Sequence, residues 1–254
     1  MNAAFADTDD WNRHWSSYAA SNALNPAQAY RRRLIFGALG LSRATSGQTH
    51  LLELGCGQGE FSNELQLRHP DLRLVGIDLS QTSVSMAQSR VPSGVFLQRD
   101  LMQPMAVPEQ YRAWATHAVC SEVLEHLDDP LTALRNVRSW LAPGARLVIT
   151  VPAGPISAFD RHIGHRRHYT PEQLRQLLLE AGLEVQSLNG AGFPFFNMYR
   201  LMVVARGKQL IDDAGGALPP SARAAIWAFA KLFRLNNSKT LRGWQLIAVA
   251  AEPR

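Results

Sequence analysis

One segment, Glu53-Leu-Gly-Cys-Gly-Gln-Gly59, constrains the fold of this chain more than any other. Its three glycines, Gly55, Gly57 and Gly59, follow an apolar run at 51–54 and precede an amphipathic stretch. Because glycine lacks a side chain, the backbone turns sharply there and comes close to a ligand, while the following helix offers free N–H groups. The segment therefore predicts a strand, a glycine-rich turn and a helix beside a bound small molecule.

Short apolar runs alternate with amphipathic stretches from residue 50 onward. The runs expected to be buried parallel strands are 51–54, 72–77, 95–97, 118–120 and 146–151, followed by a sixth strand at 183–188 and a last one at 245–250. Helices are expected between them near 59–68, 81–89 and 130–141, and a later one between Thr170 and Gly182. This alternation predicts an α/β, doubly wound sheet with right-handed crossovers. Its ligand should lie past the carboxyl ends of the strands, where the strand order reverses.

The two ends of the chain depart from this pattern. Two helices are expected first, near 10–21 and 26–41, the second beginning at the N-cap and first-turn proline of Asn25-Pro26. We assign 1–47 to N-terminal helices on the substrate side, 48–254 to the main domain, and about 193–236 to an aromatic-rich helical insertion.

The glycine spacing separates two kinds of ligand. A dinucleotide-binding turn has the pattern G-x-G-x-x-G, whose third glycine would stand at Glu60 in this chain. Here the third glycine comes one residue earlier, which disfavours a dinucleotide oxidoreductase. Glycine turns alone are weak signals, so nucleotide binding in general remains an alternative at this point.

Three further features follow successive strands. Asp78 ends the second strand, where a carboxylate would accept hydrogen bonds from a ribose diol. Asp100-Leu101 follows the third strand, in a place suited to an adenine amine and ring face. The segment Ser121-Glu-Val-Leu-Glu-His126 follows the fourth, and 141–149 enters the fifth through Pro143-Gly144.

In combination these motifs resemble the class I S-adenosylmethionine-dependent methyltransferases, in particular the broad group with a Val-Leu-Glu-His segment after strand four. The resemblance covers roughly residues 48–190 and weakens at both ends of the chain. It implies a Rossmann-like, doubly wound, seven-stranded and mostly parallel sheet with the last strand antiparallel. It also implies S-adenosyl-L-methionine as the cofactor.

The resemblance further assigns the cofactor's parts to particular residues. Glu53 and the glycine turn would hold the methionine part, Asp78 the ribose, Asp100-Leu101 the adenine, and Ser121-Glu122 the wall near the methyl group. The cofactor-binding residues expected in this way are Glu53, Gly55, Cys56, Gly57, Gly59, Asp78, Leu79, Asp100, Leu101, Ser121 and Glu122. As structural alternatives, Glu53 could cap a helix, Asp78 could N-cap the next one, and Asp100 could simply be solvated.

Methyl transfer mainly requires that the acceptor is held in line with the methyl group and that water is excluded. A base is needed only if the acceptor must first lose a proton. The candidates for catalysis are His126, His162 and His165, the last two within the segment 160–169, which should arch over the cofactor. Structural hydrogen bonding by His165 and Tyr169 is the alternative. The histidine spacing at 162, 165 and 168 also invites a metal, but it lies among arginines, and no metal is expected.

The acceptor is expected to be a small molecule, anionic or hydrophobic, with oxygen slightly favoured over nitrogen or carbon. Aromatic residues at 193–200 and 227–233 form either a small satellite core, a dimer contact or an apolar wall for substrate. The alternatives are a lipid-linked or macromolecular acceptor, or a cofactor-binding partner protein that has lost transfer activity. No RNA-binding module is evident, so no nucleic-acid partner is expected.

Composition and charge bear on where the protein is located and on what it contacts. The first ten residues lack the features of a secretory signal, and the apolar runs are too short to span a bilayer. Cys56 and Cys120 are expected to be thiols in the core. The formal net charge is +5, but the basic residues are scattered apart from clusters at 31–33 and 166–167. We expect a cytoplasmic monomer or homodimer, with peripheral membrane contact as the alternative.

Overall fold

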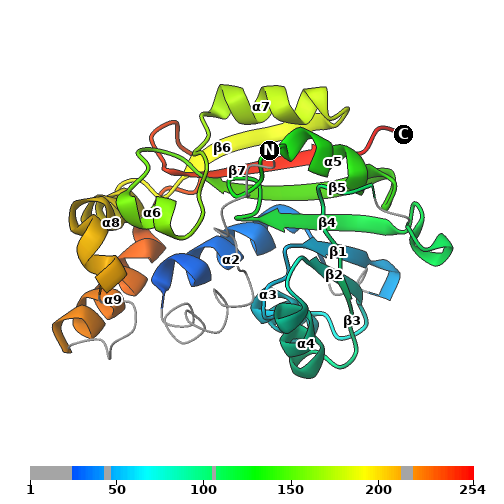
Figure 1. Cartoon of the computed structure of the whole chain (residues 1–254), viewed down its shortest axis with the longest axis horizontal. Helices are drawn as coiled ribbons and strands as arrows, with labels where there is room; N and C mark the ends of the chain where they lie inside the picture. The colour runs from blue at the N-terminus through cyan, green and yellow to red at the C-terminus, as the bar shows by residue number, and fades with distance from the viewer. Residues whose placement is uncertain (1–24, 43–46, 105–106, 213–219) are drawn as a thin grey trace, which may run out of the picture.

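A computed structural model describes residues 25–42, 47–104, 107–212 and 220–254 (Figure 1). The helix expected near 10–21 lies outside the described residues. The seven strands are β1 (His50–Leu54), β2 (Arg73–Asp78), β3 (Val95–Gln98), β4 (Ala115–Ser121), β5 (Leu141–Pro152), β6 (Glu184–Ala191) and β7 (Gln245–Ala251).

The strands form one sheet in the order β3-β2-β1-β4-β5-β7-β6. Strands β1 to β5 are parallel to one another, whereas β7 runs antiparallel to both β5 and β6. The expected mostly parallel, seven-stranded sheet with an antiparallel last strand is confirmed. The chain moves from β1 towards β3 and then returns to β4 on the other side of β1, so the strand order reverses where β1 and β4 lie side by side. A ligand in an open α/β sheet binds at that reversal.

One described helix precedes the first strand, and the others lie between strands. They are α2 (Pro26–Leu39), α3 (Glu60–Arg68), α4 (Gln81–Arg90), α5 (Pro130–Arg138), α6 (Ala158–His162), α7 (Pro171–Glu180), α8 (Phe195–Asp212) and α9 (Pro220–Leu232), with 3-10 turns at Glu109–Tyr111 and Phe233–Leu235. The expected caps are present, because the Asn25 side chain accepts from the amide of Ala27 and Thr170 forms a capping box with Gln173.

Helix α6 was not expected, because the segment 160–169 was interpreted as a loop. Its five residues are too few for a hydrophobic period to be visible. A capping box starts it: Ser157 accepts from the backbone of Asp160, and the Asp160 carboxylate accepts from the amide of Ser157.

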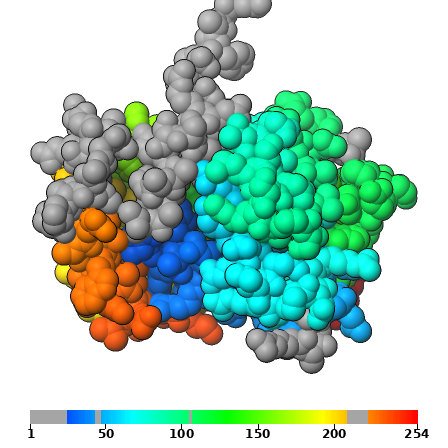
Figure 2. Space-filling view, turned by 90° about the horizontal axis from the view of Figure 1, so that it is seen from below, coloured from blue at the N-terminus to red at the C-terminus, as the bar shows by residue number. Residues whose placement is uncertain are grey.

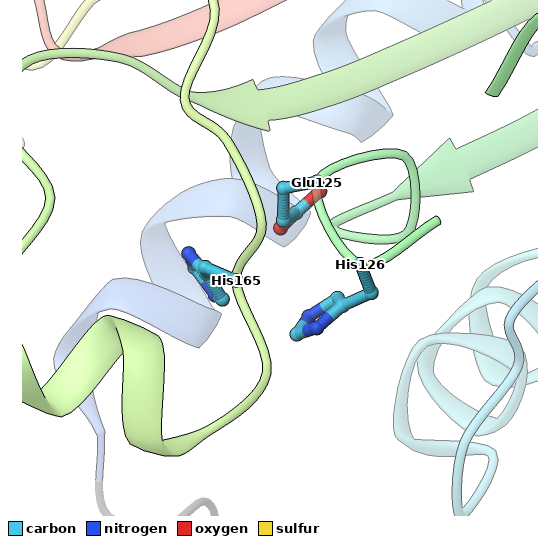
Figure 3. Close-up of side chains that lie close together, drawn as sticks. All are labelled: Glu125, His126 and His165. Atoms are coloured by element: carbon cyan, nitrogen blue, oxygen red, sulfur yellow. The ribbon is translucent and has the colours of Figure 1, made fainter. Parts of the chain in front are cut away.

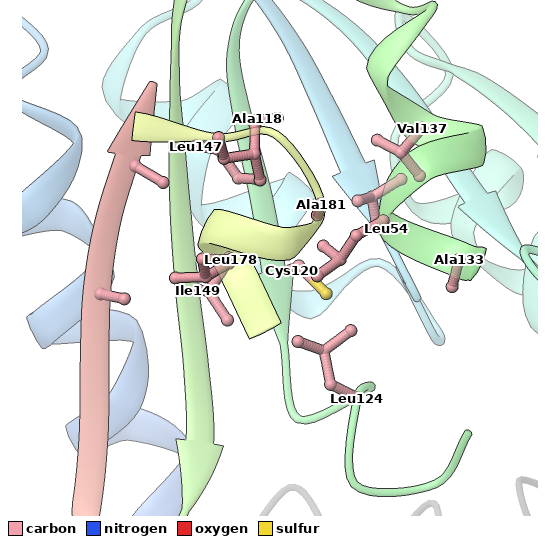
Figure 4. Close-up of a cluster of buried hydrophobic side chains, with 14 of the residues drawn as sticks. Leu54, Ala118, Cys120, Leu124, Ala133, Val137, Leu147, Ile149, Leu178 and Ala181 are labelled. Carbon is pink, nitrogen blue, oxygen red and sulfur yellow. The ribbon is translucent and has the colours of Figure 1, made fainter. Parts of the chain in front are cut away.

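Alternate strand residues point to opposite faces of the sheet, and each face has its own core. On one face, Leu54 of β1 and Cys120 of β4 pack under α5 and α7 together with Leu178 (Figure 4). On the other face, Leu51 and its neighbours pack against α2, α3 and α4. Both cysteines are buried free thiols, as expected.

The helical segment between β6 and β7 gathers with α6 at one end of the sheet (Figure 1). Helix α9 lies beside α2 (Figure 2). Tyr30 of α2 contacts Phe196 of α8 and Phe233, with ring centroids 5.5 Å apart in both pairs. These buried rings belong to the same core as α2 and α3, so this part of the aromatic segment extends the main core and does not form a separate one. Within the described residues, no helix has the length and apolar character needed to cross a membrane.

Candidate functional site

The glycine turn, residues 55–59, joins β1 to α3 at the carboxyl edge of the sheet. Its glycines have left-handed φ values of +68°, +51° and +76°. A Cβ at Gly55 would lie 2.3 Å from Cγ2 of Val123, and one at Gly59 would lie 3.0 Å from the backbone of Ala87. Side chains at these two positions would therefore clash as well as strain the backbone. The turn passes directly beneath Val123, which belongs to the segment after β4.

Asp78 lies at the end of β2 beside the glycine turn. Its Oδ2 accepts from the amide of Gly57 and its Oδ1 from the amide of Ser80, both at 2.9 Å. Burial raises the pKa of Asp78, although these amide hydrogen bonds oppose the shift. The N-cap of α4 is Ser80 and not Asp78, so the interpretation of Asp78 as an N-cap is wrong. Leu79 is exposed next to it.

Glu53 is buried in β1 directly before the turn. Its carboxylate accepts a hydrogen bond from the Ser62 hydroxyl of α3. Burial raises the pKa of Glu53 to about 8, against the effect of that hydrogen bond. Gly59 is the N-cap residue of α3, with no side-chain cap, so Glu53 does not cap this helix. Burial also raises the pKa of the Cys56 thiol, which keeps it protonated.

The residues after β3 occupy different environments. Asp100 is partly exposed, and its Oδ1 accepts from the amide of Met102 at 2.8 Å. The side chain of Leu101 is buried against the core that α5 covers. The Asn136 side chain of α5 donates to the Leu101 carbonyl at 2.9 Å, which fixes this loop to the helix.

Ser121 and Glu122 belong to a polar network across the carboxyl ends of β4, β5 and β7. Glu122 has a left-handed φ of +55°. Its Oε1 accepts from Gln245 at 2.8 Å, and its Oε2 lies 3.0 Å from Nε of Arg31 on α2. The Ser121 hydroxyl lies 2.8 Å from that of Thr150. The Glu122 side chain therefore ties α2 to the sheet.

Glu125, His126 and His165 converge at the same edge (Figure 3). Glu125 and His126 lie in the turn after β4, and His165 lies after α6. Each offers one ligand atom, and these three atoms lie within 4.8 Å of one another. The two imidazole rings meet edge to face with centroids 4.7 Å apart. Burial lowers the pKa of His165 to about 2, so its ring is neutral at physiological pH.

The Glu125 carboxylate has an unusual environment. The residue is fully buried, and neither carboxylate oxygen has a hydrogen-bond partner among the residues that the structure describes. Burial and the nearby charge of Glu122 raise its pKa well above the usual range.

The rest of the segment 160–169 holds His165 in place. Nδ1 of His165 lies 3.1 Å from Nε2 of His168, whose Nδ1 lies 3.0 Å from the carbonyl oxygen of Gly154. Asp160 receives two hydrogen bonds from Arg200 of α8, at 3.0 and 2.7 Å. Burial raises the pKa of Asp160, but the Arg200 guanidinium prevails and holds it at about 2.

His162 is not part of this convergence. It is exposed at the end of α6. The arginines nearby tie two loops together, because the guanidinium of Arg166 pairs with Asp128 and that of Arg167 donates to the Asp128 carbonyl at 2.9 Å. The Tyr169 hydroxyl donates to the Leu124 carbonyl at 3.0 Å, which confirms a structural role for it.

Several residues of the site were missed from the sequence. Arg31 was noted only as part of the basic cluster at 31–33, and Gln245 only as the start of a strand. Their partner, Glu122, lies far from both along the chain, so no local pattern links them. Glu125 did carry a signal, since it is a charged residue that directly follows the apolar pair Val123-Leu124.

Comparisons with known proteins agree with this geometry. Residues 27–188 match the family model of a methyltransferase domain. The ubiquinone biosynthesis O-methyltransferase of Aeromonas salmonicida (strain A449) is 28% identical over 172 residues, which cover 59% of this chain and 70% of that protein. The trans-aconitate 2-methyltransferase of Paracidovorax citrulli (strain AAC00-1) is 31% identical over 111 residues, which cover 42% and 40%.

A solved structure shares the fold. Phosphoethanolamine N-methyltransferase 2 of Haemonchus contortus, in complex with S-adenosyl-L-methionine, superposes with a TM-score of 0.56 at 14% identity, over 88% of this chain and 52% of that one. The chain belongs to the methyltransferase domain family. It is an S-adenosyl-L-methionine-dependent methyltransferase, and the alternative of a dinucleotide oxidoreductase is set aside.

Proposed function

We propose that this methyltransferase transfers the methyl group to an oxygen atom of a small-molecule acceptor. The observation that carries the proposal is the convergence of Glu125, His126 and His165 beside the glycine turn (Figure 3). An oxygen acceptor becomes a good nucleophile when it loses its proton. These side chains form a polar group placed to promote that loss at the carboxyl edge, where an acceptor would approach.

The residues around the glycine turn fit the cofactor. A Cβ at Gly55 would clash with Val123, so only glycine fits there, and a cofactor bound at this turn would meet bare backbone. Asp78 presents a carboxylate for the ribose hydroxyls, and buried Glu53 would ionise to pair with the ammonium of the methionine part. We assign Cys56, Gly57 and Gly59 to the same turn, with Leu79, Asp100 and Leu101 towards the adenine and Ser121-Glu122 towards the methyl group.

When bound, the cofactor supplies an electrophilic methyl group on a sulfonium. The contribution of the chain is to hold the acceptor in line and to exclude water. The ion pair between Arg31 and Glu122 stiffens α2 over this edge, and the Asp160–Arg200 pair fixes α6 against α8. Both pairs hold the segments that would surround an acceptor.

The relatives support oxygen as the acceptor atom. One of them is by its name an O-methyltransferase of ubiquinone biosynthesis. The aligned residues cover 59% of this chain, and the proposal takes only the acceptor atom from this relative.

Transfer of a labelled methyl group into a fractionated cell extract tests the proposal. We expect label in the small-molecule fraction, and mass spectrometry of the product should locate the methyl group on oxygen. Label confined to protein, nucleic acid or lipid would contradict the proposal, and so would methylation on nitrogen or carbon. A protein that binds the cofactor but labels no fraction would instead be a non-catalytic cofactor-binding partner.

A hydrophobic or lipid-linked acceptor is the second candidate, and one observation favours it. Large apolar side chains are exposed on α8 and α9, with Leu201 51% and Trp227 66% exposed. Lys231 lies over the Trp227 ring, 5.6 Å from its centroid. An amphipathic, basic surface of this kind suits contact with an anionic membrane. Label in the lipid fraction, enhanced by anionic vesicles, would favour this candidate.

A further inference from the structure

We propose that Glu125, His126 and His165 bind a divalent transition-metal cation of the Zn²⁺ or Mn²⁺ class. No metal was expected from the sequence, because only the spacing of His162, His165 and His168 was considered. The fold instead combines His165 with two residues about forty positions earlier, which no local spacing reveals.

The donor set suits such a cation. One carboxylate and two imidazoles form a mixed oxygen and nitrogen set, which Zn²⁺, Fe²⁺ and Mn²⁺ accept. Ligand atoms around a tetrahedral Zn²⁺, at about 2.1 Å from the metal, lie roughly 3.4 Å apart. The three candidate atoms already lie within 4.8 Å of one another, so small side-chain movements would complete the site. Three protein ligands leave at least one coordination position open.

Glu125 supplies the observation that points to a ligand. It is 0% exposed, and in the part of the chain that the structure describes neither of its carboxylate oxygens accepts a hydrogen bond. A buried carboxyl group without a partner is unfavourable, because it has left water and gained no hydrogen bond or opposite charge in return. Its side chain lies with the two imidazoles (Figure 3), where a bound cation would satisfy it.

The surroundings of His165 prepare it as a ligand. The Gly154 carbonyl can only accept, so His168 must donate from Nδ1. Nε2 of a neutral His168 then accepts, which makes Nδ1 of His165 the donor between the two rings. Nε2 of His165 is left without a proton and with a free lone pair. Metal-binding histidines are oriented by this kind of hydrogen bond from their other nitrogen.

A second group, Asp160, His165 and His168, is a weaker candidate. Both Asp160 oxygens already receive hydrogen bonds from Arg200, and one also from Ser157. A cation there would lie beside a guanidinium. The charges therefore favour the group with Glu125.

The turn that carries the site is fixed by contacts that do not involve the ligand atoms. The Arg166 amide donates to the Glu125 carbonyl at 2.9 Å, and the Tyr169 hydroxyl donates to the Leu124 carbonyl. Val123, two residues before Glu125, lies over Gly55 of the glycine turn. The metal would thus lie next to the cofactor's turn.

The role of the metal rests on the proposed function. An acceptor hydroxyl bound at the open position would lose its proton to solvent more readily, because the cation stabilises the oxyanion. The oxygen would then form a bond to the methyl carbon as the bond from that carbon to sulfur breaks. The sulfonium becomes a neutral thioether, so charge and atoms balance.

Metal binding can be measured without any acceptor. The full chain, freed of metal with a chelator, is titrated with Zn²⁺ and separately with Mn²⁺ in a calorimeter, and its thermal unfolding is followed with and without each ion. We expect one equivalent to bind at this site and to raise the unfolding temperature, because a ligand of the folded state stabilises it. Glu125→Gln and His126→Gln should each weaken binding about 100-fold or more, since loss of outer-shell partners alone costs about 10- to 100-fold.

His162→Ala is the matched control, because it removes an exposed histidine of the same segment and should leave metal binding unchanged. Wild-type protein that binds neither ion would overturn the proposal. Variants Glu125→Gln and His126→Gln that bind like wild type would also overturn it, and would direct attention to Asp160 and His168. If Glu125→Gln fails to fold, His126→Gln decides alone. Metal binding without transfer to any oxygen acceptor would contradict the proposed function but leave the metal site standing.

Discussion

The amide of Gly57 donates a 2.9 Å hydrogen bond to Oδ2 of Asp78, which joins the glycine turn to the end of β2. The other oxygen of the same carboxylate accepts from Ser80 at the start of α4. Asp78 therefore stabilises the glycine turn, and the same carboxylate would also bind the ribose. Contributions to folding and to binding must be separated in any test of this residue.

Replacing Asp78 with Ala should weaken cofactor binding by about 1–3 kcal/mol, because charge-assisted hydrogen bonds are lost and the ligand hydroxyls stay unpaired. Calorimetry with S-adenosylhomocysteine measures this change. Asp78→Asn is the control, since its carbonyl oxygen can still accept one backbone hydrogen bond while the charge is absent. If both variants bind like wild type, Asp78 does not hold the cofactor.

Replacing Gly55 with Ala should lower both stability and cofactor affinity. The new Cβ would lie 2.3 Å from Cγ2 of Val123, and the φ of +68° would strain any side chain. Val123→Ala removes that contact, since the nearest remaining atom of the residue would be 3.6 Å away. The double variant should therefore recover part of the lost melting temperature and leave the cost of the strained backbone, typically about 1 kcal/mol or more.

No recovery in the double variant would contradict the close packing of the turn against the segment after β4. Val123→Ala alone serves as the baseline, so that the cost of its own truncation can be subtracted in a double-mutant cycle.

The sequence predicted the sheet because its signals are local. Runs such as 51–54 and 72–77 are buried over most of their length and are therefore largely apolar, with Glu53 and Arg73 as the charged exceptions. Capping residues such as Thr170 act within one helical turn and marked the start of α7 correctly. Helix α6 was missed because five residues show no period.

The convergence of side chains could be predicted only in part. Asp78 and the glycine turn follow adjacent strands, and topology brings such positions together. The pairing of Arg200 with Asp160 and the approach of His165 to Glu125 depend on how α6 and α8 pack. Such packing depends on many weak contacts across the fold. It produces no sequence pattern of fixed spacing from which it could be predicted.

Cofactor affinity should rise with pH between about 6 and 7.5, and Glu53 should cause the rise. Burial raises the pKa of its carboxyl group to about 8 in the free protein, so the group is mostly protonated below that value. Binding a ligand ammonium favours the ionised form, and binding therefore releases a proton. Affinity can then increase by up to about tenfold per pH unit in this range.

Glu53→Gln provides the matched control for this pH effect. Its amide can still accept from the Ser62 hydroxyl but cannot titrate, so its affinity should be lower and nearly independent of pH over the same range. The ligand's own amino group titrates at about 7.7–8.0, which is why the comparison stays below pH 7.5. Equal slopes for wild type and variant would contradict a role for Glu53.

Replacing His165 with Ala should lower methyl transfer by about tenfold or more, the low end of what a group that aids proton removal contributes. The loss is expected whether His165 accepts a hydrogen bond from the acceptor or binds a metal, since its unprotonated nitrogen is needed in both cases. Cofactor affinity should change little, because the glycine turn and Asp78 are untouched. His162→Ala, in the same segment but exposed on α6, should cost less.

Transfer rates for the His165 and His162 variants are compared after correction for the folded fraction, which thermal unfolding supplies. A purely structural role for His165 predicts another pattern, because its hydrogen bond to His168 would be lost. In that case the melting temperature would fall and activity would decline only in proportion to unfolded protein. Full turnover per folded molecule in His165→Ala would exclude His165 from the chemistry. His126, whose ring lies 4.7 Å away, would then be the residue to test next.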